Sequence, residues 1–256
     1  MYGYFIEPYW PSITHIKLSS NKIHSDSRPI RIVHISDLHC DPIPRLEEKL
    51  PAMIAAQKPD IIAFTGDSIN TPSALPIFQK CLKKIAKIAP TYVVKGNWDA
   101  WYFQDLNRFT NTGAIELDDK TNKVTIANNN IWLAGLPVGT TKTVKEIMQN
   151  VPQSDYRIFL FHYPECLEEM SKNNIDLYLA GHTHGGQVAL PLYGALITLS
   201  ATGKRYESGL YHNGKTYLYV NRGIGMEGGN APRVRFCARP EITVIDIFGS
   251  GDKNSE

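Results

Sequence analysis

Seven side chains of this sequence have the types and spacing of metal ligands. Five apolar stretches are each followed at once by such residues, namely Asp37 with His39, Asp67, Asn97, His162, and His182 with His184. Two of the five sites are pairs of residues two apart, so both side chains of a pair can point the same way from an extended turn. Imidazole, carboxylate and amide groups together are typical ligands of divalent metals.

Two aspartates, one asparagine and four histidines are too many ligands for one ion. The set suits two divalent ions that share a carboxylate, and imidazole favours zinc, iron or manganese over magnesium or calcium. Two such ions can acidify a bridging water and clamp both oxygens of an in-line displacement at phosphorus. This chemistry needs no nucleophilic side chain, and the sequence contains no P-loop or GxSxG motif.

The segments between these residues predict an alternation of strands and helices. Strands are expected over 30–35, 60–65, 91–95, 156–161 and 175–180, and helices over 45–58 and 73–89. A hairpin is expected around residues 128–130, with later strands over 209–211, 216–220 and 242–247. The alternation predicts an α/β fold whose ligands meet where the strands end, because the loops there converge on one crevice.

Composition indicates one large domain without special partners. The chain has 256 residues, 43% of them hydrophobic, and a net charge of +2, which predicts no strong attraction to nucleic acid. No run is long and apolar enough for a membrane helix, and the N-terminus does not resemble a signal peptide. We expect an N-terminal strap over residues 1–29, one domain over 30–248 and a disordered tail over 249–256.

The order of the motifs resembles the calcineurin-like metallophosphoesterase family. The motifs stand here as Asp37-Leu-His39, Gly66-Asp67, Gly96-Asn97-Trp98-Asp99, Phe161-His162-Tyr163-Pro164 and Gly181-His182-Thr183-His184. The resemblance covers about residues 28–247. It implies a four-layer α/β/β/α sandwich of two mixed sheets, which agrees with the alternation of strands and helices.

The resemblance also implies a role for each ligand. Asp37, His39 and His184 would hold the first ion. Asn97, His162 and His182 would hold the second, and Asp67 would bridge the two ions. The cofactors would be two divalent ions, with manganese favoured over iron and zinc. The implied reaction is hydrolysis of a phosphodiester or diphosphate bond by attack of a metal-bridging hydroxide, with catalytic residues Asp67, Asn97, Asp99 and His162.

One motif departs from the family pattern at Trp98, where a histidine is usual. Indole donates a hydrogen bond but does not titrate, so it cannot act as a general acid. Asp99 or a metal-bound water could replace the histidine as the proton donor. Alternatively, the leaving group could need little protonation, and this alternative favours diesters and diphosphates over alkyl monoesters as substrates. We expect Trp98 and Arg222 to contact the substrate. Core packing of Trp98 and a plain turn at Arg222 are the alternatives.

Segments near both ends resemble a bacterial branch of the family that is associated with the cell envelope. They are Tyr4-Phe-Ile-Glu-Pro-Tyr9 and, toward the other end, Gly181 to Gln187, Asn221-Arg-Gly-Ile-Gly225 and Pro240-Glu-Ile242. The branch includes phosphodiesterases and enzymes acting on UDP-2,3-diacylglucosamine in lipid A synthesis, and a membrane helix often precedes the first segment. The resemblance leaves open a lipid-linked substrate, peripheral membrane contact through the aromatic N-terminus, and a membrane-associated or cytoplasmic location. A non-catalytic metal-binding scaffold is the alternative from another functional class.

Overall fold

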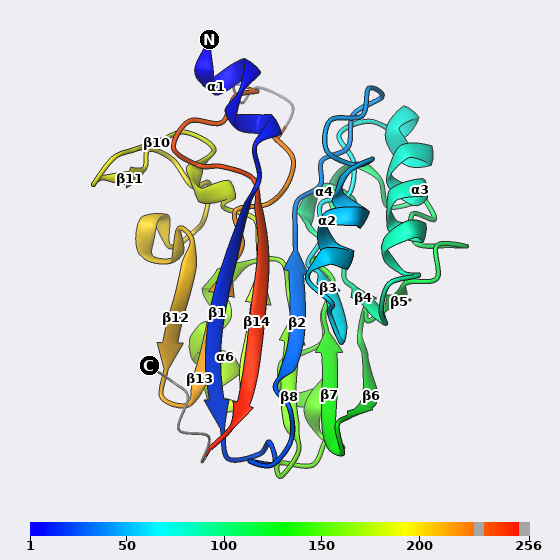
Figure 1. The fold of residues 1–256 in the computed structure, drawn as a ribbon, viewed down its shortest axis with the longest axis vertical. Coiled ribbons are helices and arrows are strands. Elements are labelled where there is room, and N and C mark those ends of the chain that lie inside the picture. Colours follow the sequence, from blue (N-terminus) through cyan, green and yellow to red (C-terminus); the bar gives the residue numbers. More distant parts are fainter. Residues whose placement is uncertain (228–232, 251–256) are drawn as a thin grey trace.

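Two mixed six-stranded sheets form the centre of the structure (Figure 1). The computed structural model describes residues 1–227 and 233–250. The first sheet has the order β1-β14-β2-β3-β4-β5, with bounds Ser12–Ser20, Glu241–Gly249, Ile30–Ile35, Ile61–Phe64, Thr91–Val93 and Ile115–Glu116. The second has the order β12-β13-β9-β8-β7-β6, with bounds Gly209–Asn213, Thr216–Val220, Leu177–Ala180, Tyr156–Leu160, Asn129–Gly135 and Lys120–Ile126. A short hairpin joins β10 (Ala189–Leu190) to β11 (Gly194–Ala195).

The period-two alternation of the central strands builds the layers. On β2, Ile30 and Ile32 face the second sheet and share a core with Leu179 of β9. Val33 and Ile35 point to the opposite face and pack in the core beneath the helices on that side. Strands with apolar residues on both faces are buried on both faces, which explains why these segments read as continuous apolar runs.

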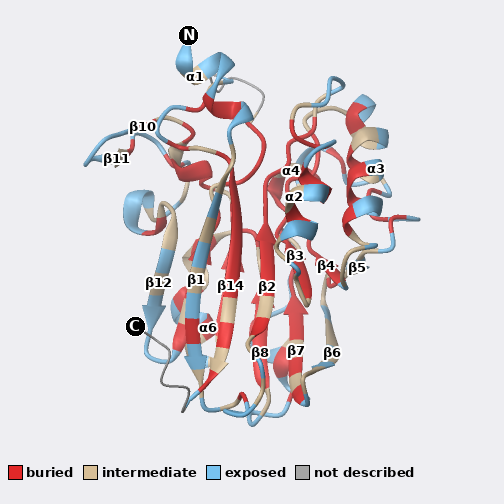
Figure 2. Cartoon of the chain, in the orientation of Figure 1, coloured by how far each residue is buried: buried red, intermediate tan, exposed pale blue. Residues whose placement is uncertain are grey.

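Helices cover the outer face of each sheet. The first sheet carries α2 (Leu50–Ala56) and α3 (Leu75–Ile85), and the second carries α5 (Val144–Met148) and α6 (Leu167–Lys172). The buried residues (Figure 2) form three core clusters, one between the two sheets and one beneath the helices on each outer face. The arrangement confirms the predicted four-layer α/β/β/α fold. The remaining helical segments are short: α1 (Tyr2–Phe5), η1 (Glu7–Tyr9), η2 (Pro72–Ala74), α4 (Asn97–Tyr102), η3 (Pro164–Cys166), η4 (His184–Gly186) and η5 (Gly203–Tyr206).

Helix boundaries differ from the sequence-based expectation. The helix predicted over 45–58 begins only at Leu50, because the residues before it form a loop. In that loop the backbone N–H of Arg45 donates to the carboxylate of Glu47, and the Arg45 guanidinium donates to the carbonyl of His39. The predicted hairpin forms with a tighter turn than expected, since Ala127 and Asn128 both adopt positive φ between β6 and β7.

The N-terminal segment supplies a strand of the first sheet. β1 lies within residues 1–29 and pairs in parallel with β14 along its whole length, from Ser12 beside Glu241 to Ser20 beside Gly249. Gly249, expected at the start of the tail, is the last residue of β14, and residues 251–256 of that expected tail lie outside the described residues. Within the described ranges, none of the helices combines the length and apolar character needed to cross a membrane.

Candidate metal centre

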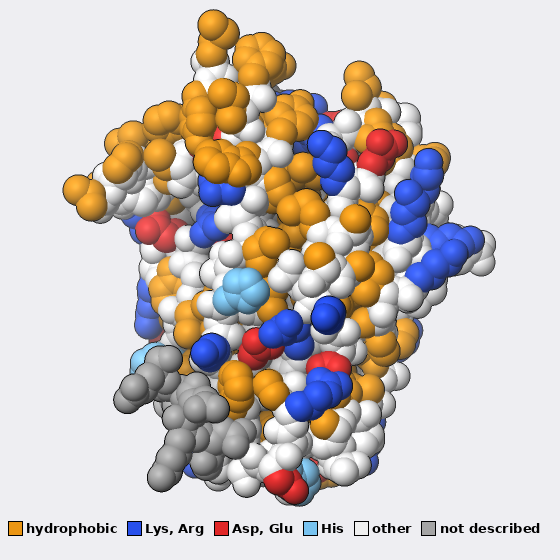
Figure 3. All heavy atoms as spheres, in the orientation of Figure 1, with side chains coloured by type: hydrophobic (Ala, Val, Ile, Leu, Met, Phe, Trp, Pro, Cys, Tyr) orange, Lys and Arg blue, Asp and Glu red, His pale blue; other side chains and the backbone are white. Residues whose placement is uncertain are grey.

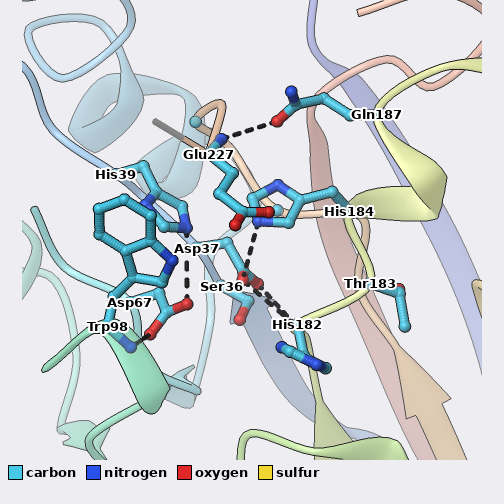
Figure 4. Close-up of polar contacts among 12 residues, drawn as sticks. Ser36, Asp37, His39, Asp67, Trp98, His182, Thr183, His184, Gln187 and Glu227 are labelled. Carbon is cyan, nitrogen blue, oxygen red and sulfur yellow. Dashed lines mark hydrogen bonds and ion pairs between the residues drawn. The ribbon is translucent and has the colours of Figure 1, made fainter. Parts of the chain in front are cut away.

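The predicted ligands follow the strands of both sheets at one end of the sandwich. Asp37 and His39 come after β2, Asp67 after β3 and Asn97 after β4. His162 follows β8, and His182 and His184 follow β9. Figure 4 shows side chains from these loops pointing toward one another. Parallel strands place their carboxyl ends at the same edge, so a short polar extension of each strand is enough to assemble the cluster.

Five of these ligand positions have an unusual backbone conformation. Asp37, His39, Asp67, His182 and His184 all have positive φ, between 39° and 72°. This left-handed region is uncommon for residues with a side chain, although aspartate and histidine adopt it more readily than most. Such strain is found where the surrounding structure imposes it, frequently at functional sites. The turns after the strands therefore direct their side chains into the crevice at a conformational cost.

The side chains form two overlapping groups around Asp37. One ligand atom each from Asp37, His39 and His184 lie within 4.8 Å of one another, and the same holds for Asp37, Asp67 and His162. Asp67 Oδ2 lies 3.5 Å from His39 Nε2 and 3.2 Å from His162 Nε2. Asp37 Oδ1 lies 3.4 Å from His184 Nε2 and 3.9 Å from His162 Nε2. Both carboxylates thus reach histidines of both expected metal sites.

Several ligand atoms are buried without a hydrogen-bond partner. Among the described residues, they include Nε2 of His39, Nε2 of His162 and Oδ1 of Asn97. A buried polar atom that lacks a partner costs about 1–3 kcal/mol, so native proteins seldom leave one without a reason. The two histidine nitrogens lie beside Asp67, as ligands that share a metal ion with it would. The residues present therefore fit divalent cations.

Neighbouring groups hold two of these rings in the tautomer that binds metal. Asn70 Nδ2 donates to the carbonyls of His39 and Met226, which leaves Asn70 Oδ1 to accept from His39 Nδ1 at 2.9 Å. His162 Nδ1 donates to the carbonyl of Thr65 at 2.7 Å. Nδ1 therefore keeps a proton in both rings, and Nε2 is the nitrogen left to bind a metal ion once its own proton is released, as in many metal sites.

His182 and His184 are placed differently from the first two histidines. The backbone N–H of His182 donates to both oxygens of Asp37 at 3.2 Å, and its ring centroid lies 5.2 Å from that of His162. His184 is buried, and the guanidinium of the buried Arg235 approaches its Nδ1 at 3.3 Å. Neither Arg235 nor Asn70 was identified from the sequence. Both lack a motif of their own, and only Asn70 is close to one, three residues after Asp67.

The protonation of the cluster reflects its crowding by carboxylates. Burial favours neutral imidazole at His162, but the charges of Asp67 and Asp37 outweigh it and raise the pKa of His162 to about 10. Burial also opposes the charge on Asp67, yet His162 and His39 hold its pKa well below the usual range. Burial and the charge of His162 lower the pKa of His182 to about 3. In the metal-free chain, one or more bound protons thus supply the positive charge beside Asp37 and Asp67 that metal ions would otherwise supply.

Asp99 fixes the backbone around Asp67. It is completely buried, and its carboxylate accepts from the backbone N–H groups of Gly96, Asp67 and Ser68 at 3.0, 2.9 and 3.1 Å. The Ser68 hydroxyl and the guanidinium of Arg108, at 3.2 Å, complete the set. Both oxygens of Asp99 are engaged. The structure therefore gives this carboxylate partners that position Asp67, rather than a free face toward a substrate.

Trp98 lies at the wall of the cluster and contacts a carboxylate that sequence reasoning missed. Its ring stacks edge-on against His39 at a centroid distance of 5.2 Å, and its backbone N–H donates to Asp67 Oδ1. Its indole approaches the side chain of Glu227, whose backbone N–H donates to Gln187 Oε1 at 2.7 Å. Figure 4 shows the Glu227 side chain directed into the cluster between His39 and His184. No sequence motif marked Glu227.

Arg222, expected to contact the substrate, has other partners. Its guanidinium donates to Ser12 Oγ at 2.9 Å and to the carbonyl of Arg239 at 3.2 Å, and it pairs with Glu241 at 3.2 Å. These groups belong to β1, β14 and the loop before β14. Arg222 therefore links β1 to β14 through its guanidinium, while its aliphatic stem packs against Gly185, next to the expected ligand His184.

Comparison with known proteins agrees with this geometry. The family described as "Calcineurin-like phosphoesterase" matches residues 30–186. Metallophosphoesterase YkuE of Bacillus subtilis is 32% identical over 96% of this chain and 89% of its own length. Phosphodiesterase YaeI of Escherichia coli is 29% identical over 96% of this chain and 92% of its own.

Among solved structures, TT1561 of Thermus thermophilus shares the fold with a TM-score of 0.52 and 14% identity, over 77% of this chain and 90% of that one. The family match spans all the motifs from Asp37 to His184, and the relatives align over nearly the full chain. This chain therefore belongs to the calcineurin-like phosphoesterases and is a metal-dependent phosphoester hydrolase.

Proposed function

We propose that this enzyme is a two-metal phosphodiesterase that also accepts diphosphate bonds. Asp37, His39 and His184 would hold one ion, Asn97, His162 and His182 the other, and Asp67 would be shared. The observation that carries the proposal is the set of buried ligand atoms without partners around two carboxylates. Two divalent ions, when bound, supply acidified water and positive charge for a phosphoryl group in displacement.

The chain's own residues prepare the site for this chemistry. Thr65 and Asn70 orient the rings of His162 and His39, so that little rearrangement is needed when ions bind. Asp99 holds the turn that carries Asp67. Because Asp99 is fully hydrogen-bonded and buried, proton donation to a leaving group does not fall to it in this proposal.

Two side chains favour a singly charged phosphodiester over a doubly charged monoester. Trp98 places a neutral indole where the family usually has a basic imidazole. Glu227 adds a carboxylate that points into the cluster. A phosphomonoester dianion would meet this carboxylate without a nearby imidazolium to offset it, whereas a diester carries one charge fewer. The pair Trp98–Glu227 therefore supports the diester assignment independently of the metal ligands.

Metal content and hydrolysis measured together test the proposal. The purified protein is stripped with a chelator, reloaded with Mn²⁺, Fe²⁺ or Zn²⁺, and assayed on bis-p-nitrophenyl phosphate and p-nitrophenyl phosphate. We expect close to two ions per chain and faster hydrolysis of the diester than of the monoester, with Mn²⁺ tested first. Asp67→Ala should lose both the bound metal and the activity. Full turnover after rigorous chelation would contradict the mechanism. The absence of stoichiometric metal and of all turnover would favour the non-catalytic scaffold.

A lipid-linked nucleotide diphosphate is a narrower candidate. It rests on the resemblance of the terminal segments to the branch that acts on UDP-2,3-diacylglucosamine. Release of UMP from this compound by the metal-loaded enzyme, at a rate well above that for bis-p-nitrophenyl phosphate, is the supporting result. Hydrolysis of the aryl diester without UMP release would retain the phosphodiesterase and exclude this substrate.

A further inference from the structure

Most of the large hydrophobic side chains that the described residues expose gather at the end of the molecule that carries the ligand loops. They come from residues 1–10, from residues 190–199 and from Phe236. We call these residues the apolar surface. Figure 3 shows it as the concentration of hydrophobic side chains over α1 and the β10–β11 hairpin. An exposed patch of this extent usually marks an interaction site.

The segments of the apolar surface are joined to one another. Phe236 pairs with Val188 and stacks edge-on against Tyr2, with a centroid distance of 6.3 Å. The carboxylate of the buried Glu7 accepts from the backbone N–H groups of Cys237 and Ala238. A buried carboxylate that accepts two backbone N–H groups holds the N-terminal segment firmly in place. The aromatic residues are therefore presented on a fixed platform.

Two leucines on this surface have both strained backbones and exposed side chains. Leu192, at the tip of the β10–β11 hairpin, has φ 67° and is completely exposed, and Leu199 has φ 55° and is largely exposed. Glycine or asparagine would relieve the strain at either position. Folding of the chain gains nothing from an unburied leucine in this conformation. A binding partner that buries the side chains gives a reason for them.

Cations lie directly behind the aromatic tips. The Arg239 guanidinium lies 3.9 Å from the ring centroid of Trp10, and the Lys204 ammonium lies 3.6 Å from that of Tyr193. Glu207, 3.8 Å from the ammonium, offsets part of the Lys204 charge. Apolar tips backed by aromatic rings and cations are typical of side chains at a lipid interface, where the tips enter the acyl region and the cations meet anionic headgroups.

The apolar surface adjoins the metal centre. The backbone of Leu199 approaches the ring of the expected ligand His182. Gly186, two residues after His184, packs so closely on Ala195 of β11 that a side chain there would overlap it. A partner that covers the apolar surface would therefore lie next to the metal centre.

We propose that the apolar surface docks on a bilayer containing anionic lipids. The sequence alone suggested contact through the aromatic N-terminus, and the structure adds the hairpin tip, the cations and the link to His182. A chain docked through this surface would present its metal centre to phosphoesters at the membrane surface. This consequence rests on the proposed function. The docking itself does not depend on hydrolysis.

Vesicle flotation tests the docking. The chain is mixed with vesicles of phosphatidylcholine alone or with 30% phosphatidylglycerol, a composition chosen as about one anionic lipid in three, within the range where adsorption of basic surfaces is strong. We expect binding to the anionic vesicles that weakens as salt is raised. Leu192→Asn should lower partitioning about tenfold, since one fully buried leucine is lost. Lys204→Gln should lower it about fivefold on anionic vesicles only.

The controls separate docking from folding and from catalysis. Leu192→Asn relieves backbone strain, so its thermal midpoint should not fall, and it should keep wild-type hydrolysis of bis-p-nitrophenyl phosphate. Ile115→Ser, which removes an exposed isoleucine from β5, should float like wild type. Failure of the wild-type chain to float, or equal flotation of Leu192→Asn, would overturn the proposal. Self-association abolished by Leu192→Asn would instead assign the surface to a second copy. Intact flotation without diester hydrolysis would contradict only the proposed function.

Discussion

Replacement of Asp99 by asparagine should destabilise the protein and the turn that carries the expected metal ligand Asp67. The carboxylate accepts four hydrogen bonds, from three backbone N–H groups and the Ser68 hydroxyl, and forms an ion pair with Arg108. Asparagine offers one acceptor oxygen in place of two. In either orientation its NH₂ group faces donors, the N–H groups of Gly96 and Asp67 in one case, and those of Ser68 and Arg108 in the other. At least two charge-assisted bonds are lost.

The magnitude follows from these partners. Hydrogen bonds to a charged group contribute about 1.5–3 kcal/mol each, and removal of one member of a buried ion pair costs about 3–5 kcal/mol. The two figures describe overlapping losses. We therefore expect Asp99→Asn to lower the free energy of unfolding by about 4 kcal/mol and the thermal midpoint by about 10 °C, at about 2–4 °C per kcal/mol for a chain approaching this length.

Thermal unfolding and metal titration, each with and without chelator, measure the effect. Asp105→Asn, at an exposed aspartate six residues further along, is the matched control and should change stability by less than about 0.5 kcal/mol. Ser68→Ala removes one of the four hydrogen bonds and should cost about 1 kcal/mol, which keeps the test informative if Asp99→Asn does not fold. Asp99→Asn with near wild-type stability and metal affinity but a much lower kcat would refute the reasoning, because it would place Asp99 in the chemistry.

Three further predictions concern the ligands themselves. Gly181→Ala should weaken metal binding about tenfold or more, because the added methyl group would overlap Asp37 Oδ2 and Ser36 Oγ. Gly139→Ala, where the added methyl group meets open space, is the control, and equal metal affinity of the two variants would contradict the prediction. Asn70→Ala should lower metal affinity about 10–100-fold by releasing the His39 ring, as measured by isothermal titration, while leaving the thermal midpoint of the metal-free chain within a few degrees. The raised pKa of His162 means that its positive charge stabilises the metal-free chain. This stabilisation should be complete below pH 6.5 and be lost as the pH rises toward about 10, and metal binding should release the proton. If urea unfolding of the chelated protein showed stability rising over that pH range, the prediction would be excluded.

The fold class and the ligand positions followed from local sequence patterns. Apolar runs of strand length, each followed at once by a polar ligand residue, predicted both the α/β architecture and the end of the sheet where the ligands meet. Ile30 to Ile35 illustrates why this works, since a strand buried on both faces must be apolar throughout and its first polar successor marks the sheet edge. The same logic identified Asp67 after β3 and His162 after β8.

Roles that depend on distant partners were decided only by the tertiary structure. Asp99 and Arg222 stood in or beside motifs, yet their hydrogen bonds direct them to Asp67 and Ser68 in one case and to Ser12 and Glu241 in the other. The bond from Arg222 to Ser12 spans 210 residues of sequence. A side chain's direction depends on such contacts and not on its neighbours along the chain.

The residues that surround the metal ligands were likewise not predictable from local sequence. Arg235 beside His184 and Glu227 beside Trp98 lie on the segment before β14, where no periodicity or motif marks them. Only the pairing of β14 with both β1 and β2 brings that segment back to the strand ends. The sequence by itself therefore determined which residues could bind metal. Packing of distant strands decided which residues surround them, because hydrogen-bond partners and burial are properties of the assembled sheets.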